Sequence, residues 1–283
     1  MMQASRLSSA PGPIGVFDSG YGGLTILRQI KAMLPQYDYL YLGDNARAPY
    51  GTRSFEVVYE FTLQAVRKLF DMGCQLVILG CNTASAKALR SIQQNDLPGI
   101  DPERRVLGII RPTAECIGDI TLSRHVGIVA TPGTIKSNTY ALEIAKLHPD
   151  IKVTGEACPM WVPLVENHEF DSPGADYFVE KSIGNLLRHD SEIDTIILGC
   201  THYPLLMDKI LKYTPRTVRV VSQGEYVASS LKDYLNRHPE MEQRLSQGST
   251  TRFLTTEEPS AFNSSASIFM GDATISAERI TLG

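Results

Sequence analysis

The stretches 74-CQLVILGCNTASAKAL-89 and 193-IDTIILGCTHYPLL-206 repeat one construction. Each has a short apolar run before a Leu-Gly pair and a cysteine, Cys81 in the first and Cys200 in the second, followed by polar residues. Short runs rich in Ile, Val and Leu are typical of buried strands. Each stretch therefore predicts a buried strand that ends in a thiol.

Apolar runs of this kind recur along the chain between segments with helical spacing. A helix is predicted over 54–73, where one apolar stripe recurs every three to four residues and Gly73 can end the helix. Strands separated by such helices indicate parallel βαβ units, and near-continuous apolar strands indicate a sheet covered on both faces. The expected strands are 14–17, 39–43, 76–80, 106–110, 126–130, 151–155, 195–199 and 218–221.

The chain also resembles itself at a nearly constant offset. The string 14-IGVFDSGYG-22 can be set against 126-VGIVATPGT-134 at an offset of 112, and Cys81 against Cys200 at an offset of 119. Ligands bind at the carboxyl ends of strands in open parallel sheets. The pattern therefore predicts an α/β fold of two similar doubly wound domains with mostly parallel sheets, related by pseudo-symmetry, with the active site in the cleft between them.

We expect a first domain of residues 12–105 plus 221–283 and a second domain of residues 106–220. The Pro- and charge-rich segment 96–105 is expected to link them, and the segment 247–271 to add a polar loop and the last strands. The candidate site residues divide between the two domains. The first would carry Asp18, Tyr50 and Cys81, and the second Thr131, Glu166, Cys200 and His202.

Length, composition and charge exclude several classes of protein. A chain of 283 residues that is 43% hydrophobic can bury a core in each of two domains. The net charge of -4 argues against a protein that binds nucleic acid by electrostatic attraction. No run of about 18 apolar residues is present, and residues 1–13 lack the apolar region of a secretion signal. We therefore expect a cytoplasmic protein with no membrane partner.

Five cysteines without a secretion signal make a disulfide framework unexpected. No C-x-x-C or H-E-x-x-H spacing occurs, so no metal site is expected, although Cys200 and His202 could coordinate a metal in principle. Cys74 and Cys116 are interpreted as small buried apolar residues. Cys158 precedes Pro159 in an expected loop that could lie close to functional neighbours.

Two facing halves would bring Cys81 and Cys200 to opposite walls of one cleft. A carbon acid that loses its proton on one face and regains it on the other needs one acid–base group for each face. Thiols suit this task, because nearby hydrogen-bond donors or positive charges can lower their pKa from about 8.5 toward neutral pH. The repeated thiol therefore indicates a racemase or an epimerase.

The sequence resembles the glutamate racemases of the aspartate/glutamate racemase superfamily from about Gly15 to the C-terminal region. The strings CNTASA and GCTHYP, together with a DSG-x-GG turn, form a specific combination in this order and spacing. Each of these strings alone would be weak evidence for the resemblance. The strings that carry the resemblance are 17-FDSGYGGLTIL-27, 43-GDNARAPYG-51, 80-GCNTASA-86, 127-GIVATPGT-134, 163-PLVE-166 and 198-LGCTHYPLL-206.

The resemblance implies cofactor-independent interconversion of L- and D-glutamate, with D-glutamate used for peptidoglycan, in a homodimeric enzyme. It implies that Cys81 is the base for D-glutamate and Cys200 the base for L-glutamate. Asp18 would assist Cys81, and Glu166 and His202 would assist Cys200. The substrate would be held by Asp18, Ser19, Tyr50, Gly51, Asn82, Thr83, Thr131, Thr134, Thr201 and His202. Strand-to-helix turns with exposed N–H groups suit a carboxylate.

Each assisting residue also has a purely structural interpretation. Asp18 and Ser19 could cap a helix, His202 could be an ordinary buried histidine, and Glu166 could be a solvated surface charge. The string 20-GYGGLT-25 is not a dinucleotide fingerprint, because Thr25 stands where the third glycine is needed.

Other activities remain open at this point. The closest alternative is an aspartate or other amino-acid racemase of the same superfamily. A cysteine hydrolase could use Cys200 with His202, but this would leave Cys81 unexplained. A two-lobed binding protein would tolerate serine at both cysteine positions, and a redox pair would form a reversible disulfide between them.

Some features depart from the family pattern or leave it open. Tyr21 stands where many members have a smaller aliphatic residue, and Ser222 where an aspartate is common. Both departures concern access to the cleft or the return of the chain to the first domain. No lysine stands out as an anchor for pyridoxal phosphate, but the sequence alone does not exclude that cofactor.

Overall fold

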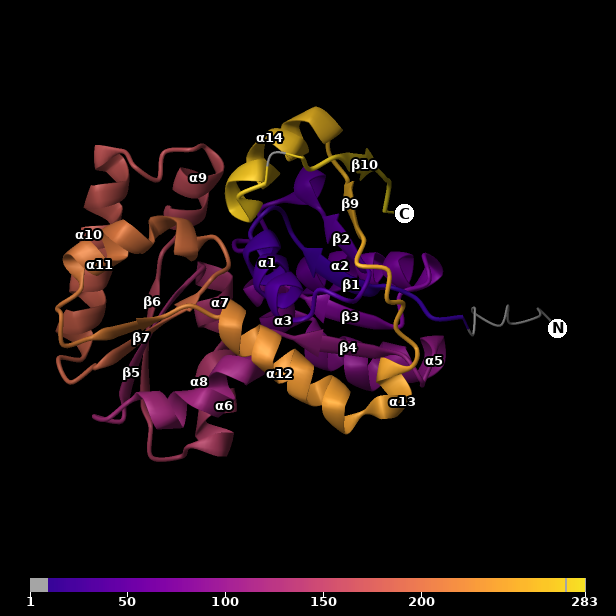
Figure 1. Ribbon diagram of the computed structural model, residues 1–283. Coiled ribbons are helices and arrows are strands. Elements are labelled where there is room, and N and C mark those ends of the chain that lie inside the picture. The colour runs from indigo at the N-terminus through magenta and orange to yellow at the C-terminus, as the bar shows by residue number, and fades with distance from the viewer. Residues whose placement is uncertain (1–9, 273, 283) are drawn as a thin grey trace.

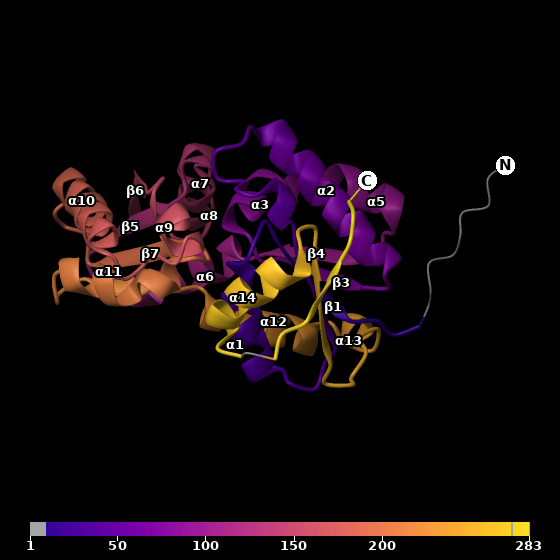
Figure 2. The ribbon, with the colours of Figure 1, turned by 90° about the horizontal axis from the view of Figure 1, so that it is seen from above.

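The computed structural model describes residues 10–272 and 274–282 (Figure 1), so residues 1–9 of the expected N-terminal extension lie outside the described range. Two parallel sheets lie in two domains set side by side, and helices cover their faces (Figures 1 and 2). The expected α/β fold of two doubly wound domains is confirmed.

The first sheet is built mainly from the N-terminal part of the chain. Its strands and the helices between them are β1 (Ile14–Asp18), α1 (Gly23–Met33), β2 (Tyr39–Gly43), α2 (Phe55–Asp71), β3 (Leu76–Leu79), α3 (Asn82–Lys87), α4 (Leu89–Ser91), α5 (Leu97–Ile100) and β4 (Arg105–Gly108), with a 3-10 turn at Asn45–Arg47 and a π turn at Ile92–Asp96.

The second sheet comes from the middle of the chain. Its elements are α6 (Ile110–Ile120), β5 (His125–Ala130), α7 (Pro132–Ser137), α8 (Thr139–Leu147), β6 (Lys152–Ala157), α9 (Trp161–Glu166), α10 (Pro173–His189), β7 (Thr195–Gly199), a 3-10 turn at Tyr203–Leu206, α11 (Met207–Tyr213) and β8 (Arg219–Val221). The chain then returns to the first domain through α12 (Gly224–Arg237), α13 (Pro239–Glu242), β9 (Thr251–Thr255), α14 (Pro259–Met270) and β10 (Ala277–Arg279).

The two sheets have the same strand order. The first runs β10-β9-β2-β1-β3-β4 and the second β6-β5-β7-β8, so β1 to β4 correspond to β5 to β8 position by position. All the strand pairs in both sheets are parallel. Because β3 and β7 occupy equivalent central positions, the cysteines that follow them lie at equivalent ends of the two domains.

The eight expected strands are all present, and their residues explain why. Every residue of β1, β2, β3 and β7 is buried, as expected for a parallel sheet covered on both faces. The helix expected over 54–73 is α2, which begins after Ser54, whose hydroxyl accepts a hydrogen bond from the Val57 N–H. Gly73 follows its end with a φ of +95°, which glycine adopts without strain.

The structure differs from the expected division at residue 106. The strand expected at 106–110 is β4, which pairs with β3 from Leu76↔Arg105 to Leu79↔Gly108 and so belongs to the first sheet. The segment 96–105 joins elements of that sheet and is not the linker between the halves. The chain crosses to the second domain at Ile109 and returns after β8, at Ser222 and Gln223. The helix α14 also lies within the segment expected to form a polar loop and the last strands.

Helix α12 lies along α1 and carries the chain back across the domain boundary (Figure 1). A single cluster of buried apolar side chains runs from Ile14 and Leu27 in the first domain to Trp161 and Val165 in the second. Part of the hydrophobic core is therefore shared between the two domains. None of the helices in the described part of the chain is long and apolar enough to span a membrane.

Replacing Leu27 with alanine should test this shared core. Leu27 lies on α1 and is completely buried, so Leu27→Ala should lower the free energy of unfolding by about 2–5 kcal/mol, through lost apolar burial and the cavity left behind. Denaturant titration measures this loss. The matched control is Leu122→Ala, because Leu122 is 91% exposed and its removal should change stability by no more than about 0.5 kcal/mol. Equal losses in the two variants would contradict the assignment of Leu27 to the core.

Candidate active site

A cavity of about 90 Å³ lies between the two domains at the carboxyl ends of their strands. It brings together all but one of the residues predicted from the sequence. The first domain contributes Asp18, Ser19, Tyr50, Gly51, Cys81, Asn82 and Thr83, and the second contributes Thr131, Glu166, Cys200, Thr201 and His202. Thr134 lies behind this lining, where its hydroxyl is within 3.1 Å of the Thr131 hydroxyl and 3.4 Å of the Thr83 hydroxyl.

Cys81 follows β3 and stands at the N-terminus of α3. Its Sγ accepts a hydrogen bond from the Ala84 N–H at 3.5 Å and lies 3.5 Å from the Ser19 hydroxyl. Burial, and to a lesser degree the Asp18 carboxylate, raise the pKa of Cys81 to about 12. The raised pKa favours the neutral thiol, which can donate a proton.

Asp18 ends β1 and is 1% exposed. Its Oδ1 accepts a hydrogen bond from the Gly20 N–H at 2.8 Å. Burial raises the pKa of Asp18 from 3.8 to about 6, although the positive charge of His202 opposes the shift. The residue at the N-cap of α1 is Gly22, so Asp18 and Ser19 are not its caps. The carboxyl group can exchange protons near neutral pH beside Cys81.

Cys200 follows β7 and has a different set of partners. Its Sγ lies 3.8 Å from Nδ1 of His202, and Nε2 of that ring lies 3.0 Å from Oε1 of Glu166. Burial disfavours the charged imidazolium, but the hydrogen bonds to Cys200 and Glu166 outweigh burial and raise the pKa of His202 well above 6.5. The Glu166 side chain is 23% exposed, so this residue is not a freely solvated charge. The second thiol thus lies beside a cation held by a carboxylate.

Close approach of the two domains depends on glycine. A Cβ at Gly22 would lie 2.3 Å from the Thr201 hydroxyl and 2.5 Å from Nδ1 of His202, closer than real Cβ atoms come. A Cβ at Gly51 would lie 2.9 Å from the Cβ of Thr131. The carbonyl of Gly51 also accepts a hydrogen bond from the second domain at 2.8 Å. A side chain at either glycine would push the walls of the cavity apart.

Asp44 was not singled out from the sequence, although it orders the loop that carries Tyr50. Its carboxylate is fully buried and accepts hydrogen bonds from the Tyr50 hydroxyl, from Nε of Arg47 at 2.7 Å and from the Thr256 hydroxyl at 2.9 Å. The polar string 43-GDNARAPYG-51 could have pointed to this role, because an aspartate in a turn often accepts hydrogen bonds from nearby groups. Its partner Thr256 lies over 200 residues away.

Further residues complete the walls of the cavity. Cys158, 1% exposed, lines it together with Pro49, Pro159, Val162 and Pro163. Cys158 therefore does lie beside the candidate site residues.

Tyr21 does not line the cavity but packs against α14. Its ring lies 5.5 Å from that of Phe262 and 5.9 Å from that of Phe269, centroid to centroid. The Phe269 ring in turn meets His202 edge-on at 5.5 Å. The larger residue at position 21 thus braces the C-terminal helix beside the histidine.

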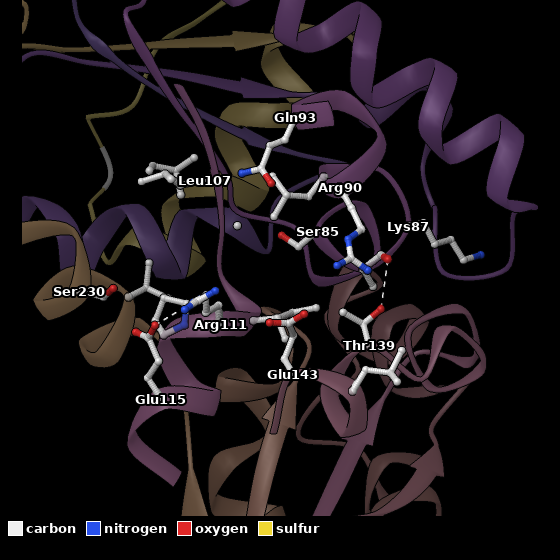
Figure 3. A pocket seen from close by; sticks show the side chains of 18 of the residues that line it. Ser85, Lys87, Arg90, Gln93, Leu107, Arg111, Glu115, Thr139, Glu143 and Ser230 are labelled. Atoms are coloured by element: carbon white, nitrogen blue, oxygen red, sulfur yellow. Dashed lines mark hydrogen bonds and ion pairs between the residues drawn. The ribbon is translucent and has the colours of Figure 1, made fainter. Parts of the chain in front are cut away.

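A larger cavity of about 780 Å³ also lies between the domains, and none of the predicted site residues lines it. Figure 3 shows Ser85 and Arg90 from the first domain on one side, and Arg111 and Glu143 from the second domain on the other. The smaller cavity is the candidate active site despite its size, because both Cys81 and Cys200 line it.

Comparisons with known proteins identify the family of this chain. The family model described as Asp/Glu/Hydantoin racemase matches residues 21–230. The chain belongs to this racemase family. It is 41% identical to the glutamate racemase of Dinoroseobacter shibae over 267 residues, which cover 91% of this chain and 95% of that protein.

Solved structures of glutamate racemases have the same fold. One from Bacillus anthracis superposes with a TM-score of 0.86 at 34% identity, covering 96% of this chain and 98% of the other. The Francisella tularensis enzyme, solved in complex with D-glutamate, gives 0.85 at 32% identity with the same coverage. The resemblance found in the sequence motifs is confirmed over nearly the whole chain.

Exchanging Asp18 for asparagine should change how stability depends on pH. Because the pKa of Asp18 is higher in the folded protein, about 6 against 3.8, the wild-type protein loses stability as the pH rises from 4 to 7. The loss is on the order of 2–3 kcal/mol. Asp18→Asn lacks this loss, so its stability relative to wild type should rise over that interval in denaturant titrations.

The control for this experiment is Asp194→Asn. Burial of Asp194 is outweighed by hydrogen bonds from the Thr121 and Thr195 hydroxyls and from the Leu122 and Ser123 N–H groups, which lower its pKa to about 2. Its contribution is therefore complete above pH 4, and the stability of this variant relative to wild type should stay flat between pH 5 and 7. A flat profile for Asp18→Asn as well would show that Asp18 does not titrate in this range.

Proposed function

We propose that the protein is a glutamate racemase that interconverts L- and D-glutamate by cofactor-independent, two-base proton transfer at the α-carbon. The single observation that best supports this proposal is the pair of buried thiols at equivalent strand ends of two similar domains, both lining one small cavity. A reaction that moves a proton from one face of a carbon to the other uses such a pair.

In this proposal Cys200 removes the α-proton of L-glutamate and Cys81 returns a proton to the opposite face. The Cys81 thiol, with its raised pKa, is protonated and ready to donate. His202 can hold the positive charge that a thiolate at Cys200 needs, and Glu166 stabilises that charge at 3.0 Å. The Glu166–His202–Cys200 chain therefore supports the L-to-D direction.

For D-glutamate the roles exchange. Cys81 becomes the base, and its proton must first leave a site where burial favours the thiol. Asp18, with a pKa of about 6, is mostly ionised at neutral pH and can take this proton. The positive α-ammonium group of the substrate would further stabilise a thiolate.

Substrate binding is assigned to Ser19, Tyr50, Gly51, Asn82, Thr83, Thr131, Thr134, Thr201 and His202, together with Asp18. No lysine or arginine is among the residues that line the cavity in the described structure. The two carboxylates would therefore be held by hydroxyl and amide donors and by backbone N–H groups at strand-to-helix turns. Asp18 and Glu166 offer negative charge for the ammonium group.

We also propose that the enzyme works without pyridoxal phosphate, because the cavity lining has no lysine to form a Schiff base. Cytoplasmic location, a homodimer, and use of the product in peptidoglycan synthesis are further parts of the proposal. They rest on the resemblance to glutamate racemases.

The first test is proton NMR of the purified protein, freed of pyridoxal phosphate, with L-glutamate in deuterium oxide. We expect the α-proton signal to disappear while the optical rotation decays to zero. Removing the α-proton from one face and adding a deuteron to the other both exchanges the proton and inverts the α-carbon. Exchange without loss of rotation would indicate return to the same face. If both signals persist, glutamate is not the substrate, and the same measurement with aspartate decides between the two amino acids.

Replacing either cysteine of the pair should abolish racemisation. A serine hydroxyl is not ionised near neutral pH, so Cys81→Ser and Cys200→Ser should each reduce turnover by roughly 10²–10⁴-fold or more in both directions. Polarimetry with each enantiomer measures the loss. The control is Cys116→Ser, since Cys116 lies on α6 outside the cavity lining, and it should keep wild-type turnover. Wild-type turnover in Cys81→Ser or Cys200→Ser would remove that cysteine from the mechanism.

A further inference from the structure

Three buried polar side chains form a closed ring of hydrogen bonds beside the site. They are Asn82, the residue after Cys81; Tyr140, on α8 of the second domain; and Gln223, the residue before α12. Their exposed fractions are 2%, 3% and 3%. Polar groups buried this deeply cost free energy unless each is paired.

Every bond of the ring is short. Nδ2 of Asn82 donates to Oε1 of Gln223 at 2.7 Å, Nε2 of Gln223 donates to the Tyr140 hydroxyl at 2.7 Å, and that hydroxyl donates to Oδ1 of Asn82 at 2.7 Å. A fourth bond leaves the ring, because Nε2 of Gln223 also donates to the carbonyl of Ile109 at 3.0 Å.

The Ile109 carbonyl fixes the direction of all these bonds. A carbonyl oxygen can only accept, so the nitrogen of the Gln223 amide must face Ile109 and its oxygen must face Asn82. Asn82 then has to present its nitrogen to Gln223 and its oxygen to Tyr140. One backbone acceptor thereby excludes the flipped orientation of both amides.

The fixed orientation of the Asn82 amide affects the cavity, because Asn82 lines it. Its oxygen is bound by Tyr140 and one of its two N–H bonds is used by Gln223. The amide nitrogen therefore keeps its second N–H as a free donor. A flipped amide would offer an oxygen, which repels a carboxylate, so the ring keeps Asn82 as a donor next to Cys81.

The ring also lies where the two domains are connected. Ile109 is at the crossing from β4 to α6, and Gln223 is at the return crossing from β8 to α12, next to the unusual Ser222. Tyr140 belongs to the second domain and Asn82 to the first. Ile110 and Thr139, which are the chain neighbours of Ile109 and Tyr140, line the larger interdomain cavity. Figure 3 shows Thr139 there. The ring thus ties both crossings to a residue of the active-site lining.

We propose that Tyr140 and Gln223 are positioning residues that lock the Asn82 amide as a hydrogen-bond donor to a substrate carboxylate and hold the two domains in register beside Cys81. This inference rests on the proposed function. Neither residue lines the small cavity, so both act through Asn82. The ring sets the alignment of the substrate between the two thiols.

The test is Tyr140→Phe, which removes one oxygen and keeps the shape of the side chain. Asn82 then keeps only one of the two bonds that orient its amide, the one to Gln223, so we expect kcat/KM for glutamate to fall roughly 10-fold, mainly through a higher KM. In an Asn82→Ala background the same exchange should have no further effect on kcat/KM, because the amide that it positions is gone.

The matched control is Tyr39→Phe. Tyr39 is 2% exposed and its hydroxyl donates to the Leu34 carbonyl at 2.6 Å, away from the cavity. It should lose stability as Tyr140→Phe does, but keep wild-type kcat/KM. Wild-type kcat/KM in Tyr140→Phe, or equal losses with and without Asn82, would overturn the proposal.

A second measurement does not depend on activity. The side-chain NH₂ signals of Asn82, identified by their disappearance in Asn82→Ala, should exchange slowly with solvent in the wild-type protein and faster in Tyr140→Phe, but not in Tyr39→Phe. Equal exchange rates of these signals in all three proteins would show that the ring does not hold the Asn82 amide in place. Slow exchange of the Asn82 NH₂ signals in a wild-type protein that does not act on glutamate would contradict the proposed function but not the fixed orientation of the Asn82 amide.

Discussion

Burial of four ionisable side chains around one small cavity is the constraint on which the rest of the site depends. Asp18, Cys81, Cys200 and His202 are all less than 7% exposed. Desolvation favours the neutral forms and raises the pKa of both Asp18 and Cys81. His202 stays charged because Glu166 and Cys200 accept its hydrogen bonds. The same burial that makes charge costly separates the two thiols into a protonated donor and a partner beside a cation.

Equivalent folding units give the two thiols equivalent places and different chemistry. The order β2-β1-β3-β4 in one sheet and β6-β5-β7-β8 in the other puts each cysteine after the same central strand. Symmetry of the backbone does not extend to the partners, which are a serine and an aspartate for Cys81 but a histidine and a glutamate for Cys200. The two enantiomers of the substrate are mirror images, but an amino acid still presents unlike groups to the two walls, and the unlike partners of the two thiols match this difference.

The parts of the structure that follow local rules could be predicted from the sequence. Periodicity located all eight core strands, and the repeated Leu-Gly-Cys pattern located both thiols. The strand β4 was given to the wrong half, because a Pro- and charge-rich segment resembles a linker whether or not its ends lie in one sheet. Tyr140 and Gln223 were missed because they bond residues that lie 58 to 141 positions away in the chain. The bond between Asp44 and Thr256 spans 212 positions. Such contacts leave no periodic trace.

The group Cys200–His202–Glu166 alone would also fit a cysteine hydrolase, whose nucleophile, base and orienting acid are joined in this way. Two features of the site argue for proton transfer instead. Hydrogen bonds to Cys200 and Glu166 outweigh burial and raise the pKa of the buried His202 imidazole, which suits a fixed partner of a thiolate better than a base that must repeatedly gain and lose a proton. The opposite wall carries a second thiol with its own acid, Asp18. A hydrolase has no use for a second thiol in that position, whereas a two-base racemase requires it.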